Sequence, residues 1–132
     1  MNLAAEMLGH VPTAVAFDRD QLAACIEACF EAVQACTACA DACLGKDMVV
    51  ELRRCITTNL GCADICAATG RILSRQVGDD TEMVLAALDA CRQVCRRCAD
   101  ECERYADVYE HCRICADACS RTEKACRILL LA

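Results

Sequence analysis

Aromatic residues are scarce in this chain of 132 residues: they make up 3% of it, and tryptophan is absent. Because large rings are missing, the hydrophobic core must be filled by Ala, Leu, Val and Cys. One proline and five glycines are too few for a loop-rich fold, since these residues dominate tight turns. A basic surface is lacking as well, because the net charge is −6 and the sequence pI is about 4.8. We therefore expect no nucleic-acid partner.

Long hydrophobic runs are also missing. No apolar run approaches the roughly 20 residues that a membrane span needs, and we expect no membrane association. The first residues, MNLAAEMLGHVP, carry no Lys or Arg ahead of an apolar stretch, which argues against a secretory leader. The expected location is therefore cytoplasmic, a compartment in which thiols stay reduced.

Cysteine is abundant where the other residues are scarce: the chain has 16 of them. Within four segments their spacings are 3, 4 or 7 residues, which is the period of one face of a helix. We predict that this face of each helix turns inward, so that thiols line the core. The cysteines are Cys25, Cys29, Cys36, Cys39, Cys43, Cys55, Cys62, Cys66, Cys91, Cys95, Cys98, Cys102, Cys112, Cys115, Cys119 and Cys126.

The pattern predicts an all-α protein, an up-down-up-down antiparallel four-helix bundle with a short N-terminal helix. We expect one domain over residues 1–132, with residues 1–16 as the short N-terminal segment and 18–131 as the cysteine-lined bundle. Short links between long helices force neighbours to run antiparallel. Aspartates that can cap a helix start each long segment, and the four are Asp18, Asp47, Asp79 and Asp107.

The ends of these helices are predicted from glycine and from the cysteine periodicity. Gly45 suits a left-handed C-cap for the first long helix, and Gly78 follows the second, which is expected to run to about Gln76. The third is expected to end near Tyr105, and the fourth to run to about Leu130.

Sixteen core thiols need a chemical explanation. Cysteine can serve as a small buried hydrophobe, but Ala or Val would pack as well without the risk of oxidation. A disulfide scaffold would be loop-rich, and a disulfide within one helix needs Cβ atoms closer than its residues allow. Two metal–sulfur bonds of about 2.3 Å can instead join thiolates one helical turn apart.

Copper(I) fits this pattern better than other soft metals. Zinc prefers closed tetrahedral sites, and iron–sulfur clusters use cysteines grouped in loop motifs. A monovalent ion balances each thiolate charge, so full loading is expected at on the order of one Cu(I) per cysteine. Without metal, buried thiols can remain neutral, because burial raises their pKa. We therefore expect the metal-free protein to fold unaided.

The unit C-x-x-C-A-D-x-C occurs at residues 36–43, 95–102 and 112–119, with a weaker copy at 62–66. These repeats and the cysteine seam resemble the bacterial copper storage protein family, specifically its cytosolic branch of cysteine-rich four-helix bundles. The resemblance covers essentially the whole chain from Asp18 to Leu130. It implies a homotetramer of bundles, each storing many Cu(I) ions that enter at one end.

The two ends of the seam differ in composition. Apolar side chains are expected to plug one end, namely Leu22, Leu73, Val84, Leu88 and Leu129. Soft ligands and their neighbours occupy the other end, namely Met48, Tyr105, Val108, His111, Cys43, Cys102 and Cys112. Thioether and imidazole groups bind Cu(I), so this end is the expected entrance, and the family resemblance supports His111 as a ligand.

Polar residues on the seam leave two interpretations open. Asn59 and Thr69 either line the channel or bond to a neighbouring backbone carbonyl. His10 is expected to be structural or solvated.

Three functional hypotheses remain at this point. The first is Cu(I) storage without catalysis, supplied or emptied by a copper chaperone or by a small thiol or chelator. The second is Zn or Cd sequestration of metallothionein type. The third is a redox enzyme or an iron–sulfur carrier, which is disfavoured because no C-x-x-C lies on a βαβ unit and no nucleophile motif is present.

Overall fold

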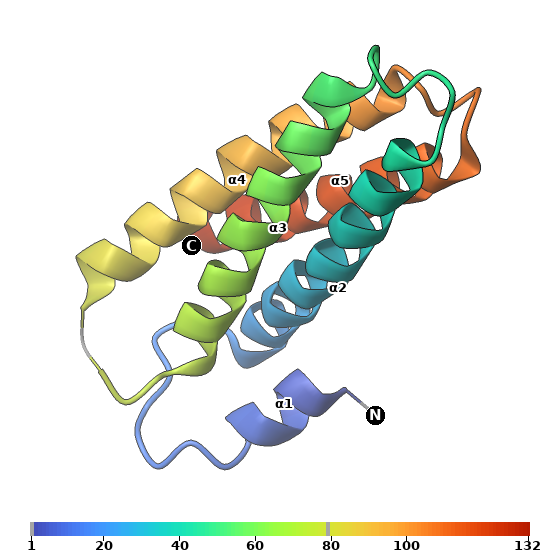
Figure 1. Cartoon of the computed structure of the whole chain (residues 1–132). Coiled ribbons are helices and arrows are strands. Elements are labelled where there is room, and N and C mark those ends of the chain that lie inside the picture. Colours follow the sequence, from blue (N-terminus) through green and yellow to red (C-terminus); the bar gives the residue numbers. More distant parts are fainter. Residues whose placement is uncertain (1, 79) are drawn as a thin grey trace.

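The computed structural model describes residues 2–78 and 80–132, and within them every regular element is a helix. The all-α prediction is therefore confirmed. Figure 1 shows four long helices and one short one. The elements are α1 (Leu3–Leu8), α2 (Arg19–Leu44), α3 (Arg53–Ser74), α4 (Thr81–Glu103) and α5 (Glu110–Leu131).

The four long helices form a closed ring in chain order. Each of α2, α3, α4 and α5 packs against the next, and α5 returns to pack against α2. The α2–α3 and α4–α5 links lie at one end of the bundle, and the α3–α4 link lies at the other (Figure 1). Neighbouring helices are consequently antiparallel, as predicted. The short helix α1 packs against α2 near the end that holds the α3–α4 link.

Two helices begin at aspartate caps. The Asp18 carboxylate accepts a hydrogen bond from the Gln21 backbone N–H at 2.9 Å, which confirms the predicted start of α2. The Asp80 carboxylate accepts one from the Met83 N–H at 3.1 Å at the start of α4. Asp79, the residue predicted for this role, lies outside the described residues.

The other two predicted starts are wrong. Residues 47–52 form turns, so α3 begins at Arg53 rather than near Asp47. Leu52 occupies the N-cap position, has no side-chain cap, and is fully buried. Burial of Leu52 therefore fixes this start. At α5 the N-cap is Tyr109, in extended backbone, instead of Asp107.

The helix ends also differ in detail from the sequence prediction. Gly45 has φ of −88° and ψ of 3°, so it closes α2 without the left-handed conformation predicted for it. Its N–H bonds to the Ala42 carbonyl at 3.1 Å, which tightens the last turn. The helix α3 stops at Ser74, two residues before the expected Gln76, and α4 stops at Glu103.

By length and composition α2 could cross a membrane, since an 18-residue window has mean hydropathy 1.4. The sequence-based statement that no stretch approaches a membrane span is therefore too strong for this helix. Half of that window is buried inside the bundle. The hydropathy of α2 is accounted for by its cysteine face, which packs against α3 and α5.

Candidate metal site

All sixteen cysteine side chains lie in the core, each with 0–1% of its surface exposed, and all are free thiols. This burial confirms the predicted seam. It follows from the spacing, because each helix turns the same face toward the axis of the bundle. The thiols form groups at successive levels along that axis.

The deepest groups lie toward the end where α2 begins. The Sγ atoms of Cys25 and Cys126 are 3.7 Å apart, and Cys29 completes a group whose sulfurs all lie within 4.8 Å of one another. A second group joins Cys62, Cys66 and Cys95. These two groups bring together thiols from all four long helices.

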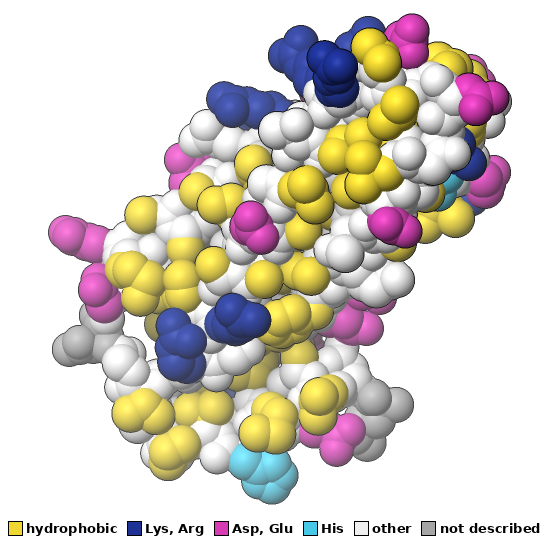
Figure 2. All heavy atoms as spheres, viewed as in Figure 1, with side chains coloured by type: hydrophobic (Ala, Val, Ile, Leu, Met, Phe, Trp, Pro, Cys, Tyr) yellow, Lys and Arg dark blue, Asp and Glu magenta, His cyan; other side chains and the backbone are white. Residues whose placement is uncertain are grey.

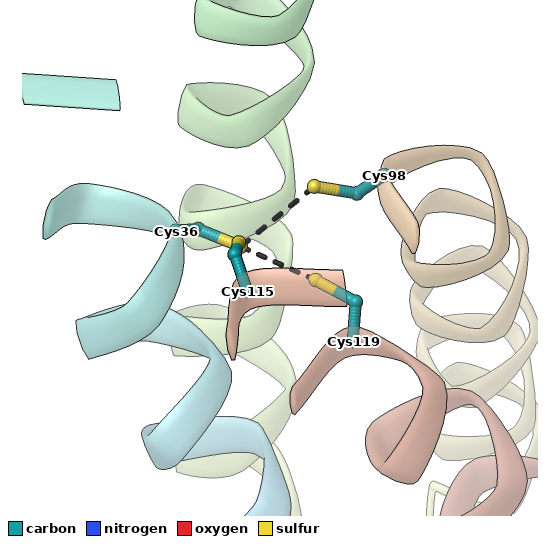
Figure 3. A group of neighbouring side chains, drawn as sticks. All are labelled: Cys36, Cys98, Cys115 and Cys119. Carbon is teal, nitrogen blue, oxygen red and sulfur yellow. Dashed lines mark hydrogen bonds between the residues drawn. The ribbon is translucent and has the colours of Figure 1, made fainter. Parts of the chain in front are cut away.

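The central group contains four thiols from three helices (Figure 3). The sulfur of Cys36 on α2 lies 3.4 Å from that of Cys119 and 3.7 Å from that of Cys115, both on α5. Cys98 on α4 completes the group at 3.8 Å from Cys36. Two thiolates bound to one ion at about 2.3 Å each can span about 4.6 Å. The sulfurs therefore lie within bridging distance of shared metal ions.

The group nearest the α2–α3 and α4–α5 links includes a nitrogen ligand. It contains Cys39, Cys43, His111 and Cys112, with all ligand atoms within 4.8 Å of one another. The Nδ1 atom of His111 lies 3.3 Å from the Cys39 sulfur and 3.7 Å from the Cys112 sulfur. We call this group the entrance cluster. It joins His111 to the thiols, as the sequence predicted.

Two other residues predicted for this end do not join the entrance cluster. Met48 lies in the turn before α3 and is 38% exposed, and Val108 lies in the α4–α5 link and is 61% exposed. Both were predicted to continue the helical seam, but α3 and α5 begin after them. Tyr105 is half-buried, and its hydroxyl donates a hydrogen bond to the Glu51 carbonyl at 3.1 Å.

The groups are continuous along the axis. A further set of Cys39, Cys102 and Cys115 shares one thiol with the entrance cluster and one with the central group. Cys62 lies 3.9 Å from Cys119, which links the central group to the deep ones. The sulfur atoms thus form a column in which each thiol has another within reach of a bridging ion.

Asn59 interrupts this column with an amide. It is fully buried, and its Oδ1 accepts hydrogen bonds from the thiols of Cys98 at 3.0 Å, Cys115 at 3.1 Å and Cys102 at 3.5 Å. Its Nδ2 donates to Cys55 at 3.5 Å. Of the two interpretations left open, Asn59 follows the first and lines the channel. Thr69 follows the second, since its hydroxyl donates to the Ile65 carbonyl at 2.8 Å.

Protonation in the metal-free column depends on burial and on hydrogen bonds between thiols. Burial raises the pKa of Cys112 to about 11. Hydrogen bonds donated to neighbouring thiols, together with burial, raise the pKa of Cys29 and of Cys98. Bonds accepted from several thiols lower the pKa of Cys62. Burial and the nearby Lys46 lower the pKa of His111, which favours the neutral imidazole that can bind metal.

The opposite end of the column is sealed by apolar side chains. Leu22, Leu73, Leu88 and Leu129 are each 0–1% exposed. Val84, the fifth residue predicted here, is only half-buried. Below the deepest thiols the buried core formed by these four leucines is therefore hydrocarbon.

One buried charge was missed by the sequence reasoning. Glu101 on α4 is 7% exposed and forms ion pairs with Arg104 at 3.0 Å and Arg54 at 3.5 Å. It precedes Cys102 in the chain and faces outward between α3 and α4, where these arginines reach it. Its charge is therefore matched by arginines from α3 and from the C-cap of α4.

Comparison with known proteins agrees with this geometry. The model of the family "Copper storage protein" matches residues 18–131. The uncharacterized cysteine-rich protein YhjQ of Bacillus subtilis (strain 168) is 33% identical over 82 residues, which cover 62% of this chain and 72% of that protein.

Solved structures of a Streptomyces lividans protein are more similar still. The copper storage protein Ccsp loaded with 10 copper equivalents is 47% identical, has a TM-score of 0.95, and is matched over 97% of this chain and 98% of its own. A structure of the cytosolic copper storage protein from the same organism with five coppers is 50% identical, with a TM-score of 0.84 over 86% and 94% of the two chains. A variant of Ccsp with two histidines replaced by alanine is 51% identical, with a TM-score of 0.86 over 87% and 97%. With its family match over the whole bundle and its core of sixteen thiols, this chain belongs to the copper storage protein family.

Proposed function

We propose that this chain is a cytosolic store that binds many Cu(I) ions through its sixteen core thiols, with His111 as an additional ligand at the entrance. The continuous column of sulfurs carries the proposal, because neighbouring thiols on different helices lie 3.4–3.9 Å apart. Such spacing suits ions that share bridging thiolates. The cytosolic assignment is supported by the Streptomyces lividans relative, which is described as cytosolic.

The geometry favours storage of a monovalent ion over a few divalent ones. Sixteen thiolates in a buried column would carry a prohibitive negative charge without cations. Charge balance with Cu(I) requires on the order of one ion per thiolate. Zinc or cadmium sequestration would need separate tetrahedral sites, whereas the two groups of four ligands found here are joined by the set Cys39, Cys102 and Cys115, which shares one thiol with each.

Copper enters and leaves at the entrance cluster in this proposal. The other end is closed by four fully buried leucines. At the entrance end His111 is only partly buried and contacts the thiols of Cys39 and Cys112. From there an ion can move inward by exchange between thiolates on neighbouring levels, with a copper chaperone or a small thiol or chelator as its donor or acceptor. No step in this sequence requires catalysis.

A second element of the proposal is a homotetramer of such bundles. A groove of about 980 Å³ runs between α1, α2 and α5. Apolar side chains exposed along it include Met7 (63%), Phe30 (43%) and Ile114 (51%), and apolar side chains gather on the face shown in Figure 2. Exposed apolar surface of this kind is typical of a subunit contact. Light scattering of the metal-free and loaded protein will give the mass of the assembly.

Anaerobic titration of the reduced protein with Cu(I), in competition with a chromophoric Cu(I) chelator, tests the storage function. We expect tight binding of on the order of one ion per cysteine. Loading Cu(I) and Zn(II) at equal excess tests selectivity, and a bundle filled with zinc would refute the proposal. Saturation after about four ions would also refute it, since that result indicates separate tetrahedral sites.

The entrance is tested by His111→Ala, with His10→Ala as the matched control because His10 is exposed on the other end of the bundle. We expect His111→Ala to change the rate of copper exchange with the chelator while total capacity stays nearly intact, since the sixteen thiols remain. His10→Ala should match the unmodified protein in both. Equal exchange rates for the two variants would place the entrance elsewhere.

A further inference from the structure

The entrance cluster is closed in this structure. Cys39, Cys43 and Cys112 each expose 0–1% of their surface. The Nε2 atom of His111 is also buried, and it has no hydrogen-bond partner. The three thiols and the Nε2 atom of His111 are therefore shielded from solvent, although the His111 side chain as a whole is only partly buried. A reagent reaches these thiols only after some part of the protein moves.

Two side chains from different links cover His111. The ring of Tyr109 stacks on the His111 imidazole, with centroids 5.4 Å apart and an interplanar angle of 14°. The Nζ atom of Lys46 lies 4.9 Å from the centroid of the Tyr109 ring, a cation–π contact. Lys46 belongs to the α2–α3 link and Tyr109 to the α4–α5 link, so this contact joins the two links across the end of the bundle.

The two ends of the bundle differ in whether the helices that begin there have side-chain caps. At the leucine end α2 and α4 begin at aspartate caps, Asp18 and Asp80. At the entrance end α3 and α5 begin without any side-chain cap. A helix start without a side-chain cap lacks one stabilising hydrogen bond, although backbone carbonyls satisfy the N–H groups of Arg53 and Cys112. The missing caps favour a local opening at the entrance end over one at the leucine end.

We propose that Lys46 and Tyr109 form a closure over His111, and that their contact breaks before copper or any other reagent reaches the entrance cluster. The closure itself does not depend on where copper enters. Only its role in copper loading rests on the proposed function, in which copper enters at this end. A single cation–π contact between partly exposed side chains is weak, so the closure shields the thiols yet opens without unfolding the bundle. The second link-to-link bond, from Tyr105 to the Glu51 carbonyl, limits how far the links separate.

Thiol modification of the reduced, metal-free protein tests the closure without copper. The protein is mixed anaerobically with 5,5′-dithiobis(2-nitrobenzoate), and each modified thiol releases one coloured thionitrobenzoate. We expect Lys46→Met to accelerate the fastest phase at least about twofold, since the low end of the range for a cation–π contact corresponds to that factor and Lys46 and Tyr109 are both partly buried. Lys124→Met is the matched control, since Lys124 is the other lysine of the chain and is exposed on α5.

Conservative variants separate the contact from a general effect on folding. Lys46→Arg and Tyr109→Phe keep the cation and the ring and should react at the unmodified rate, whereas Tyr109→Ala should react at least as fast as Lys46→Met. Circular dichroism checks that each variant is folded, and Lys46→Met decides the outcome if Tyr109→Ala is unfolded. Mass spectrometry should find the first labels on Cys39, Cys43 and Cys112.

Two results would overturn the closure: equal rates for Lys46→Met and Lys124→Met, or first labels on the deep thiols Cys25, Cys29 and Cys126. Transfer of Cu(I) from its bicinchoninate complex is measured on the same variants. Faster transfer in Lys46→Met supports the closure as the entrance for copper. Faster thiol modification with unchanged copper transfer would leave the closure standing and overturn the proposed direction of loading.

Discussion

Asn59 offers a direct test of how the empty column is stabilised. Its amide oxygen accepts from the thiols of Cys98, Cys115 and Cys102, and all four side chains are fully buried. Replacing Asn59 by Leu substitutes an apolar side chain of similar shape and leaves these thiols without that acceptor. Replacing it by Ala removes the acceptor and also opens a cavity.

The magnitude follows from the number of bonds lost. Buried donors that lose their acceptor cost about 1–3 kcal/mol, and thiols are weak donors, so we expect Asn59→Leu to lower the free energy of unfolding by about 1–2 kcal/mol. Asn59→Ala should lose about 2–3 kcal/mol because the cavity adds to it. At about 3–5 °C per kcal/mol for a chain of this size, the midpoint of Asn59→Ala should fall by roughly 6–15 °C.

The assay is thermal unfolding of the reduced, metal-free protein followed by far-ultraviolet circular dichroism. Thr69→Val is the matched control, because Thr69 is equally buried on α3 but its hydroxyl bonds only to a carbonyl of its own helix. We expect the control to change stability by less than about 1 kcal/mol. If Asn59→Leu unfolds at the same temperature as Thr69→Val, the thiol–amide bonds do not stabilise the empty bundle and the reasoning fails.

Three further predictions concern pH, glycine and the buried charge. Burial raises the pKa of Cys112 to about 11, above the value of about 8.5 for an unfolded thiol. The contribution of this thiol to the free energy of unfolding is therefore complete below about pH 8.5 and is lost as the pH rises to about 11. Thermal unfolding of the metal-free protein at a series of increasing pH values will check this. A melting temperature that increases as the pH rises above about 9 would contradict it. Gly61→Ala should stabilise the protein by about 0.5–1 kcal/mol, because an added Cβ meets no atom within 4 Å; Gly70→Ala should gain less in the same denaturation experiment, since its Cβ would lie 2.8 Å from Phe30. Glu101→Ala should lower the free energy of unfolding by only about 1 kcal/mol in urea denaturation. The reason is that Arg54 and Arg104 are 83% and 62% exposed and return to water. A decrease several times larger would show that the ion pair between Glu101 and Arg54 holds α3 against α4.

The cysteine seam could be predicted completely because it depends on a periodic pattern. Every cysteine from Cys25 to Cys126 is buried, as the spacings of 3, 4 and 7 indicated. The start of α2 was equally predictable, since Asp18 and Gln21 form a local bond that the sequence contains. Such features need no knowledge of distant residues.

The missed features all depend on tertiary contacts. Asp47 has the right chemistry for a cap, but burial of Leu52 delays the start of α3. Neither the Lys46–Tyr109 contact nor the pairing of Glu101 with Arg54 follows a helical period, because each joins segments that meet only in the folded bundle. The three thiols that bond to Asn59 come from α4 and α5, whereas Asn59 lies on α3.

The close approach of thiols on different helices also determines how the metal-free protein is oxidised over time. Cys36 and Cys119, and likewise Cys66 and Cys95, have their sulfurs 3.4 Å apart, so a small shift would let a two-electron oxidant join either pair as a disulfide. Each cross-link would remove two ligands from the column. If copper enters at the entrance cluster as proposed, peroxide that takes the same route should first oxidise Cys39 and Cys112, and the damage should then spread inward. Bound Cu(I) occupies the sulfur lone pairs, so a filled bundle should keep its capacity longer in an oxidising cell than an empty one.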